Sequence, residues 1–176
     1  MLEKMVVIFG TGKAQPGEPP YVLAEQVGRA LAEAGFIIAN GGYGGTMLAA
    51  AKGAAEAGGT VVGVTCSAFK NSVANAYVTR EVTTDSLEER LKNLIKAGDA
   101  YVVLPGGTGT LLELASVWEL KNKGFLDGAK PIILTGGFWR PLLQLVSTED
   151  PRCGRSVVFA EDADETVKLI RKHLNA

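Results

Sequence analysis

The fold is decided by one stretch of the sequence, Ala100-Tyr101-Val102-Val103-Leu104-Pro105-Gly106-Gly107-Thr108-Gly109-Thr110-Leu111-Leu112-Glu113. Its first five residues are apolar throughout, as is typical of a parallel strand that helices cover on both faces. A loop with three glycines and two threonines follows, and a segment of helical period begins at about Thr110. A strand, a glycine-rich turn and a helix in this order form the unit of nucleotide-binding folds of the Rossmann type.

The same alternation of strand and helix runs through the whole chain. Apolar, β-branched runs predict strands at 5–9, 36–39, 60–64, 77–82, 100–104, 131–134 and 157–159. Segments of helical period predict helices at 22–34, 47–57, 86–97, 110–123, 141–146 and 164–174. We therefore predict one α/β domain over residues 1–176, with a Rossmann-like, doubly wound parallel sheet and helices on both faces.

Length and charge restrict the class of partner. A chain of 176 residues can bury one substantial core, and its net charge of −1 gives no general attraction to nucleic acid or to an anionic membrane. No apolar run approaches the length that spans a bilayer, and no signal-peptide pattern precedes the first strand. We expect a cytoplasmic protein that binds a small molecule rather than nucleic acid or membrane.

Several kinds of catalysis lack their residues in this sequence. The single histidine is His173, near the chain end, and the two cysteines, Cys66 and Cys153, lie far apart. Histidine-assisted nucleophilic catalysis and a zinc centre are therefore improbable. We predict neither a metal nor an organic cofactor.

Three glycine-rich loops follow predicted strands, at the sheet edge where such folds bind ligands. Glycine lets the backbone approach an anion closely, and helix N-termini present free N–H groups to it. We therefore predict that a phosphate is bound by Gly10, Thr11, Gly12, Gly41, Gly42, Gly44, Gly45, Thr46, Pro105, Gly106, Gly107, Thr108, Gly109 and Thr110. The structural alternatives are close strand–helix packing for the second loop, and a tight turn with a Thr110-x-x-Glu113 capping box for the third.

Two familiar nucleotide motifs do not fit the first loop. A dinucleotide fingerprint requires a third glycine where Gln15 stands, and an acidic residue where Asn40 ends the second strand. A P-loop requires a lysine where Glu18 stands. NAD and ATP are therefore poor candidate ligands.

Arg90 lies on the predicted helix 86–97, at the edge of an apolar stripe. A guanidinium at this border can reach over the core toward the strand ends. The periodicity alone favours the plainer alternative, a surface arginine that is snorkelling or ion-paired.

The stretch from Asp99 to Glu113 resembles the Pro-Gly-Gly-x-Gly-Thr-x-x-Glu signature of the Lonely Guy (LOG) family, and the resemblance covers roughly residues 5–145. Studied members are cytokinin riboside 5′-monophosphate phosphoribohydrolases. The resemblance implies that Arg90 and Glu113 are catalytic residues, and it implies a homodimer with the site near the subunit interface. The second loop is also similar to that of molybdenum cofactor carrier proteins.

Two functions therefore remain open. The first is a hydrolase that cleaves the N-glycosidic bond of a nucleoside 5′-monophosphate, of the AMP or cytokinin-riboside type, to the free base and ribose 5-phosphate. The second is a non-catalytic carrier of a nucleotide or a molybdopterin-type phosphate ligand, in which Arg90 and Glu113 form a structural ion pair.

Overall fold

A computed structural model of the chain describes residues 4–70 and 73–175. Seven parallel strands form one sheet, namely β1 Met5–Phe9, β2 Ile37–Asn40, β3 Val61–Cys66, β4 Arg80–Thr84, β5 Ala100–Val103, β6 Ile132–Thr135 and β7 Val158–Ala160. The helices are α1 Pro19–Glu33, α2 Thr46–Glu56, α3 Leu87–Ala97, α4 Thr108–Asn122, α5 Arg140–Ser147 and α6 Ala163–Leu174, with a short 3-10 helix at Cys153–Ser156. This confirms the predicted Rossmann-like α/β fold.

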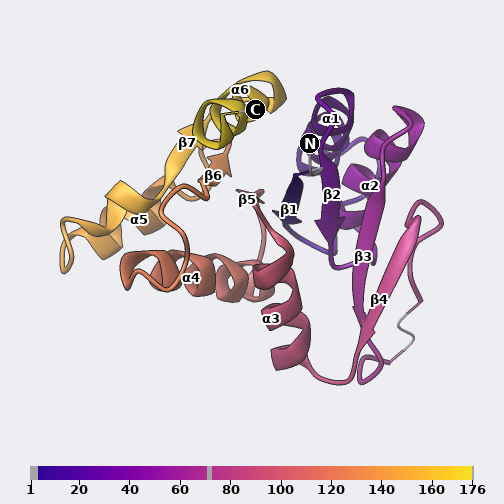
Figure 1. Cartoon of the computed structure of the whole chain (residues 1–176), viewed down its shortest axis with the longest axis horizontal. Helices are drawn as coiled ribbons and strands as arrows, with labels where there is room; N and C mark the ends of the chain where they lie inside the picture. The colour runs from indigo at the N-terminus through magenta and orange to yellow at the C-terminus, as the bar shows by residue number, and fades with distance from the viewer. Residues whose placement is uncertain (1–3, 71–72, 176) are drawn as a thin grey trace.

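The order of the strands creates a crevice at the centre of the sheet. The order is β4-β3-β2-β1-β5-β6-β7, so the chain builds outward from β1 to one edge and then returns to β5, on the other side of β1. Figure 1 shows β4 and β7 at the two ends of this sheet. The loops that leave β1 and β5 therefore diverge to opposite faces, which opens a space beyond their carboxyl ends.

Alternating side chains of the central strands divide the core into two layers. Val6 and Ile8 of β1 pack with α1, α2 and α6, whereas Val7 and Phe9 pack with α3 and α4. Figure 1 shows α1 and α2 on one side of the sheet and α3 and α4 on the other. Both faces of the strands are thus buried, which explains their continuous apolar sequence.

Most predicted elements begin within one residue of the observed ones, and three begin two or more residues away. The predicted edge strand 77–82 begins too early, because Tyr77 and Val78 donate hydrogen bonds to Asn75 in a turn and the strand begins only at Arg80. Helix α1 begins at Pro19 rather than residue 22, because prolines are tolerated in a first helical turn. Helix α4 begins at Thr108 rather than Thr110.

Within residues 4–70 and 73–175, no helix combines the length and the apolar character that crossing a membrane requires.

Candidate functional site

A cavity of about 610 Å³ opens at the carboxyl ends of β1 and β5, where the chain reverses its direction of growth. All three glycine-rich loops contribute to its wall, together with α3 and α4. Ten of the predicted site residues line it, namely Gly10, Thr11, Gly12, Gly41, Arg90, Gly107, Thr108, Gly109, Thr110 and Glu113. The six others do not line it, namely Gly42, Gly44, Gly45, Thr46, Pro105 and Gly106.

The N-terminus of α4 faces the cavity with its backbone donors unused by the helix. Gly107 is the N-cap, and the first intrahelical bond runs from the Leu111 N–H to the Gly107 carbonyl. The N–H groups of Thr108, Gly109 and Thr110 precede that bond and carry the positive end of the helix dipole. The alternative interpretation of Thr110-x-x-Glu113 as a capping box is wrong, because Thr110 already lies inside the helix.

The second glycine loop packs against the first. The backbone N–H and hydroxyl of Thr46 both donate to the Thr11 carbonyl, at 2.8 and 3.0 Å. A Cβ at Gly45 would lie 2.3 Å from that same carbonyl oxygen, and a Cβ at Gly10 would lie 2.4 Å from the Thr46 hydroxyl. The two loops therefore approach this closely only because both residues are glycine, and together they form one wall beside the cavity.

Arg90 is buried, with 7% of its surface exposed, so the surface arginine that the periodicity favoured is wrong. Its Nε donates a 2.7 Å hydrogen bond to the carbonyl of Val64, two residues before the end of β3. A Cβ at Gly41 would lie 1.7 Å from Arg90 Nη2. The side chain thus reaches over the sheet edge because residue 41 has no side chain of its own.

Glu113 lies in the second turn of α4, and its carboxylate faces Arg90 within the cavity. Arg90 Nη1 lies 3.8 Å from Glu113 Oε1, which is ion-pair range but longer than a hydrogen bond. Burial raises the pKa of Glu113 to about 7, and the positive charge of Arg90 only partly opposes this effect. The carboxyl group is therefore able to exchange a proton near neutral pH.

Four further residues at the site were not found by the sequence analysis. Tyr43, Phe69 and Lys13 line the cavity, and Asn75 binds the second glycine loop through its side-chain amide. Tyr43 stands among the glycines of the second loop, which was a usable signal. Phe69 and Asn75 fall in an irregular polar segment whose sequence shows no period, so nothing in it marked them.

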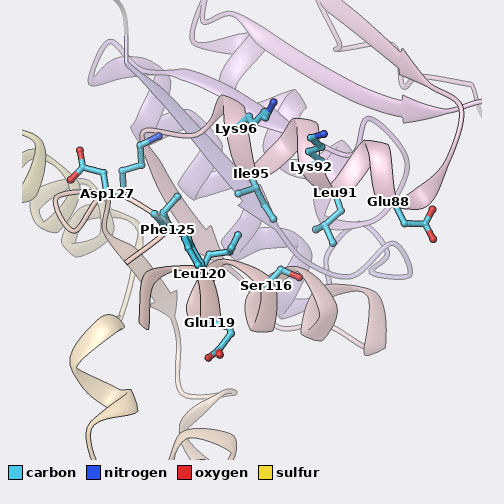
Figure 2. Close-up of a pocket in the computed structure, with 12 residues that line it drawn as sticks. Glu88, Leu91, Lys92, Ile95, Lys96, Ser116, Glu119, Leu120, Phe125 and Asp127 are labelled. Atoms are coloured by element: carbon cyan, nitrogen blue, oxygen red, sulfur yellow. The ribbon is translucent and has the colours of Figure 1, made fainter. Parts of the chain in front are cut away.

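A second cavity, of about 780 Å³, lies between α3 and α4. Figure 2 shows Leu91 and Ile95 of α3 pointing toward α4, where Leu120 contributes to the opposite wall. Phe125 lies at its end with 81% of its surface exposed. The charged side chains around this α3–α4 groove are Glu88, Lys92, Lys96, Glu119, Asp127 and Lys130.

Among the described residues, no group of three or more histidine, cysteine, aspartate or glutamate side chains is arranged to hold a metal ion. Cys66 and Cys153 are both buried free thiols. The predicted lack of a metal cofactor stays a prediction.

A model of the SLOG cluster4 family matches residues 3–149 of the chain, which is most of its length. The chain belongs to the SLOG cluster4 family. The predicted likeness to LOG proteins and to molybdenum cofactor carriers is thereby confirmed at the level of family and fold.

The SLOG cluster4 chain is related to an enzyme by sequence and to carriers by structure. It is 29% identical over 179 residues to a cytokinin riboside 5′-monophosphate phosphoribohydrolase of Rhodococcoides fascians, with 96% of this chain and 89% of the relative covered. It superposes with a TM-score of 0.82 and 24% identity on the molybdenum cofactor binding protein from Rippkaea orientalis, and 99% of each chain is covered. The molybdenum cofactor carrier protein of Chlamydomonas reinhardtii gives a TM-score of 0.80 at 27% identity, again with 99% of each chain covered.

Proposed function

We propose that the protein hydrolyses the N-glycosidic bond of a nucleoside 5′-monophosphate, of the AMP or cytokinin-riboside type, to the free base and ribose 5-phosphate. The observation that carries this proposal is the presence of Glu113 and Arg90 in the same cavity as the free N-terminus of α4. The relative in Rhodococcoides fascians, named as a phosphoribohydrolase, supports the same reaction class.

The phosphate is held at the glycine-rich end of the cavity. Backbone N–H groups at the start of α4 donate to its oxygens, and the Thr108 hydroxyl adds a donor. Positions 107 and 109 leave room for it, because a Cβ at either residue would meet no atom within 4 Å. Lys13 lines the same cavity and contributes a positive charge.

Glu113 acts on the sugar, which becomes cationic as the bond to the base weakens. Its ionised carboxylate stabilises that developing charge and receives a proton from the attacking water. The N-glycosidic bond breaks with its electron pair leaving on the base nitrogen. The water oxygen adds to C1′ of the ribose, and the proton on Glu113 passes to the base. Arg90 orients the substrate and favours the ionised form of Glu113.

The test is base release, followed by chromatography, from AMP, GMP, CMP and isopentenyladenosine monophosphate. Glu113→Gln is expected to lower the rate at least about 100-fold while AMP binding persists, because it removes a general base and leaves the phosphate site intact. Arg90→Ala is expected to lower both the rate and the affinity. Glu33→Gln, an exposed change at the end of α1, is the matched control and is expected to leave both unchanged.

The second candidate function is a carrier that binds a nucleotide or a molybdopterin-type phosphate ligand without reaction. It is favoured by the likeness to the Chlamydomonas reinhardtii carrier protein over 99% of both chains. Tight AMP or pterin phosphate binding, with no base released from any nucleotide and no effect of Glu113→Gln, would establish the carrier and exclude the hydrolase.

We also propose that a second copy of the chain docks on the α3–α4 groove. The groove has an apolar wall and the exposed Phe125, which is typical of a surface that another protein covers. Side chains at its rim carry both positive and negative charges. A two-fold axis can bring Lys92 of each copy to Glu119 of the other. Light scattering on the wild type is expected to give a dimer mass, and Phe125→Glu a monomer. Leu145→Glu, at another exposed apolar position on α5, is the control and is expected to remain dimeric.

A further inference from the structure

Two aromatic rings lie beside the Arg90 guanidinium. Its Cζ lies 5.5 Å from the ring centroid of Tyr43 and 5.8 Å from that of Phe69. The two rings are 6.0 Å apart and tilted by 47°, so they lie side by side and both present a face to the cation. Aromatic faces attract a guanidinium through the ring quadrupole, and this attraction offsets part of the cost of burying its charge.

Tyr43 is itself held in place through both its hydroxyl group and its backbone. The Cys66 N–H donates a 2.7 Å hydrogen bond to its hydroxyl, and the Asn75 side-chain amide donates one of 2.9 Å to its backbone carbonyl. Tyr43 belongs to the second glycine loop, and Cys66 is the last residue of β3. The ring is therefore a fixed surface, tied to the same strand whose Val64 carbonyl receives Arg90 Nε.

This arrangement leaves the terminal N–H groups of the guanidinium without a hydrogen bond to the described part of the chain. Within the described residues, its hydrogen bond is made by Nε alone, and Nη1 stays 3.8 Å from Glu113. A bidentate pair with a carboxylate would instead occupy two N–H groups and fix both partners. Contact with the aromatic rings uses none of these N–H groups.

We propose that Tyr43 and Phe69 are positioning residues, which hold Arg90 off Glu113 and keep its terminal N–H groups available to a phosphate or ribose oxygen of the ligand. The inference deepens the proposed function and rests on it for the identity of the ligand. It assigns a role to the aromatic residue inside the second glycine loop, and to a residue of the irregular segment after β3.

Binding is tested by calorimetry with AMP as the probe. Tyr43→Leu and Phe69→Leu are each expected to weaken AMP binding about tenfold, which is the effect of losing a partly desolvated cation–π contact. Tyr43→Phe and Phe69→Tyr keep the aromatic faces and are expected to lose less than about threefold. Phe69 is partly exposed, so Phe69→Leu preserves the fold even if Tyr43→Leu does not. Equal losses in the leucine and the aromatic variants would overturn the proposal.

A second measurement needs no ligand, and it separates this inference from the proposed function. Carbon-13 NMR follows the titration of Glu113, assigned through Glu113→Gln. The charged groups that line the cavity with it are Arg90 from α3 and Lys13 from the loop after β1. In Phe69→Leu and Tyr43→Leu the released guanidinium is expected to close on Glu113 and to lower its pKa by about one unit.

An unchanged or raised pKa of Glu113 in both leucine variants would overturn the positioning role, whatever the enzyme assay shows. A lowered pKa in a protein that releases no base would retain this inference and exclude the hydrolase. Lys13→Ala is the control, because it alters the charge in the cavity without touching the aromatic pair. It is expected to raise the pKa of Glu113.

Discussion

Gly41 lies directly against Arg90, so closely that a Cβ at position 41 would come within 1.7 Å of Nη2 and 2.6 Å of Met47 Sδ. The absence of one side chain on the second loop therefore fixes where the guanidinium of another element rests. This contact couples the glycine-rich wall of the cavity to its charged centre.

Gly41→Ala is expected to displace Arg90 and to weaken AMP binding at least about tenfold, since the guanidinium cannot keep its place beside an alanine methyl group. Calorimetry measures the change. Gly44→Ala is the matched control in the same loop, because its Cβ would meet only Gly12 O at 3.6 Å, an ordinary contact. Equal losses in the two variants would show that the loop backbone, rather than Arg90, decides affinity.

Gly107→Ala tests the proposed phosphate site at the start of α4. A Cβ at Gly107 meets no protein atom within 4 Å, so the unfolding temperature is expected to stay unchanged. Because the residue lines the cavity, the added methyl group is expected to hinder a phosphate and to weaken AMP binding about tenfold or more. Gly128→Ala also adds a methyl group in open space, outside both cavities described above, and is expected to have no effect. Unimpaired AMP binding by Gly107→Ala would place the phosphate elsewhere.

Glu113 makes the stability of the protein depend on pH. Burial raises the pKa of Glu113 from 4.5 in the unfolded chain to about 7 in the folded protein. Between pH 4.5 and 7 the folded protein therefore keeps a proton on Glu113 that the unfolded chain has lost. The contribution of this group to stability is therefore greatest below pH 4.5 and falls as the pH rises toward 7, by on the order of 3 kcal/mol. Urea unfolding from pH 4.5 to 8 measures this loss, and Glu113→Gln is expected to remove most of it. The idea fails if both proteins show the same dependence.

Asn75 holds the second glycine loop in place. Its side-chain amide donates to the carbonyls of Gly42 and Tyr43, and its side-chain oxygen accepts from the Tyr77 N–H. Asn75→Ala is expected to cost about 2 kcal/mol of unfolding free energy, because the Tyr43 carbonyl and the Tyr77 N–H lose their partner. The Gly42 carbonyl still accepts from the backbone N–H of residue 75. Asn75→Asp keeps the acceptor for Tyr77 but loses both donated bonds, so it is also expected to be destabilising. Urea unfolding measures both losses, and the same unfolding free energy in the wild type and the two variants would contradict the role.

Much of the fold was predictable, because a parallel sheet covered on both faces requires continuous apolar strands and this sequence shows them. The glycine loops were predictable as a group for the same reason, since each follows such a strand. The depth of Arg90 was not predictable, because periodicity gives only its angle on α3. Its burial depends on the Val64 carbonyl and on the empty space at Gly41, which lie on other elements.

The different roles of the glycines were also not predictable from the sequence. Gly42 and Gly45 have positive φ angles of 76° and 63°, and they shape the loop, whereas Gly107 and Gly109 leave open space. The sequence alone does not distinguish a glycine in one role from a glycine in the other. Only the contacts of the folded chain distinguish those that form the wall from those that leave room in front of it.

Helix α4 fixes the distance between its N-terminal amide donors and the carboxylate of Glu113. Its first amide donors begin at Thr108, and Glu113 follows five residues later on the same rigid element, which is about 7.5 Å along the helix axis. Under the proposed function, a substrate presents its phosphate and its reacting carbon at this one spacing. The proposed hydrolase would then discriminate against molecules with a longer chain of phosphates, or with none, through the length of one helix and without a side chain that blocks them.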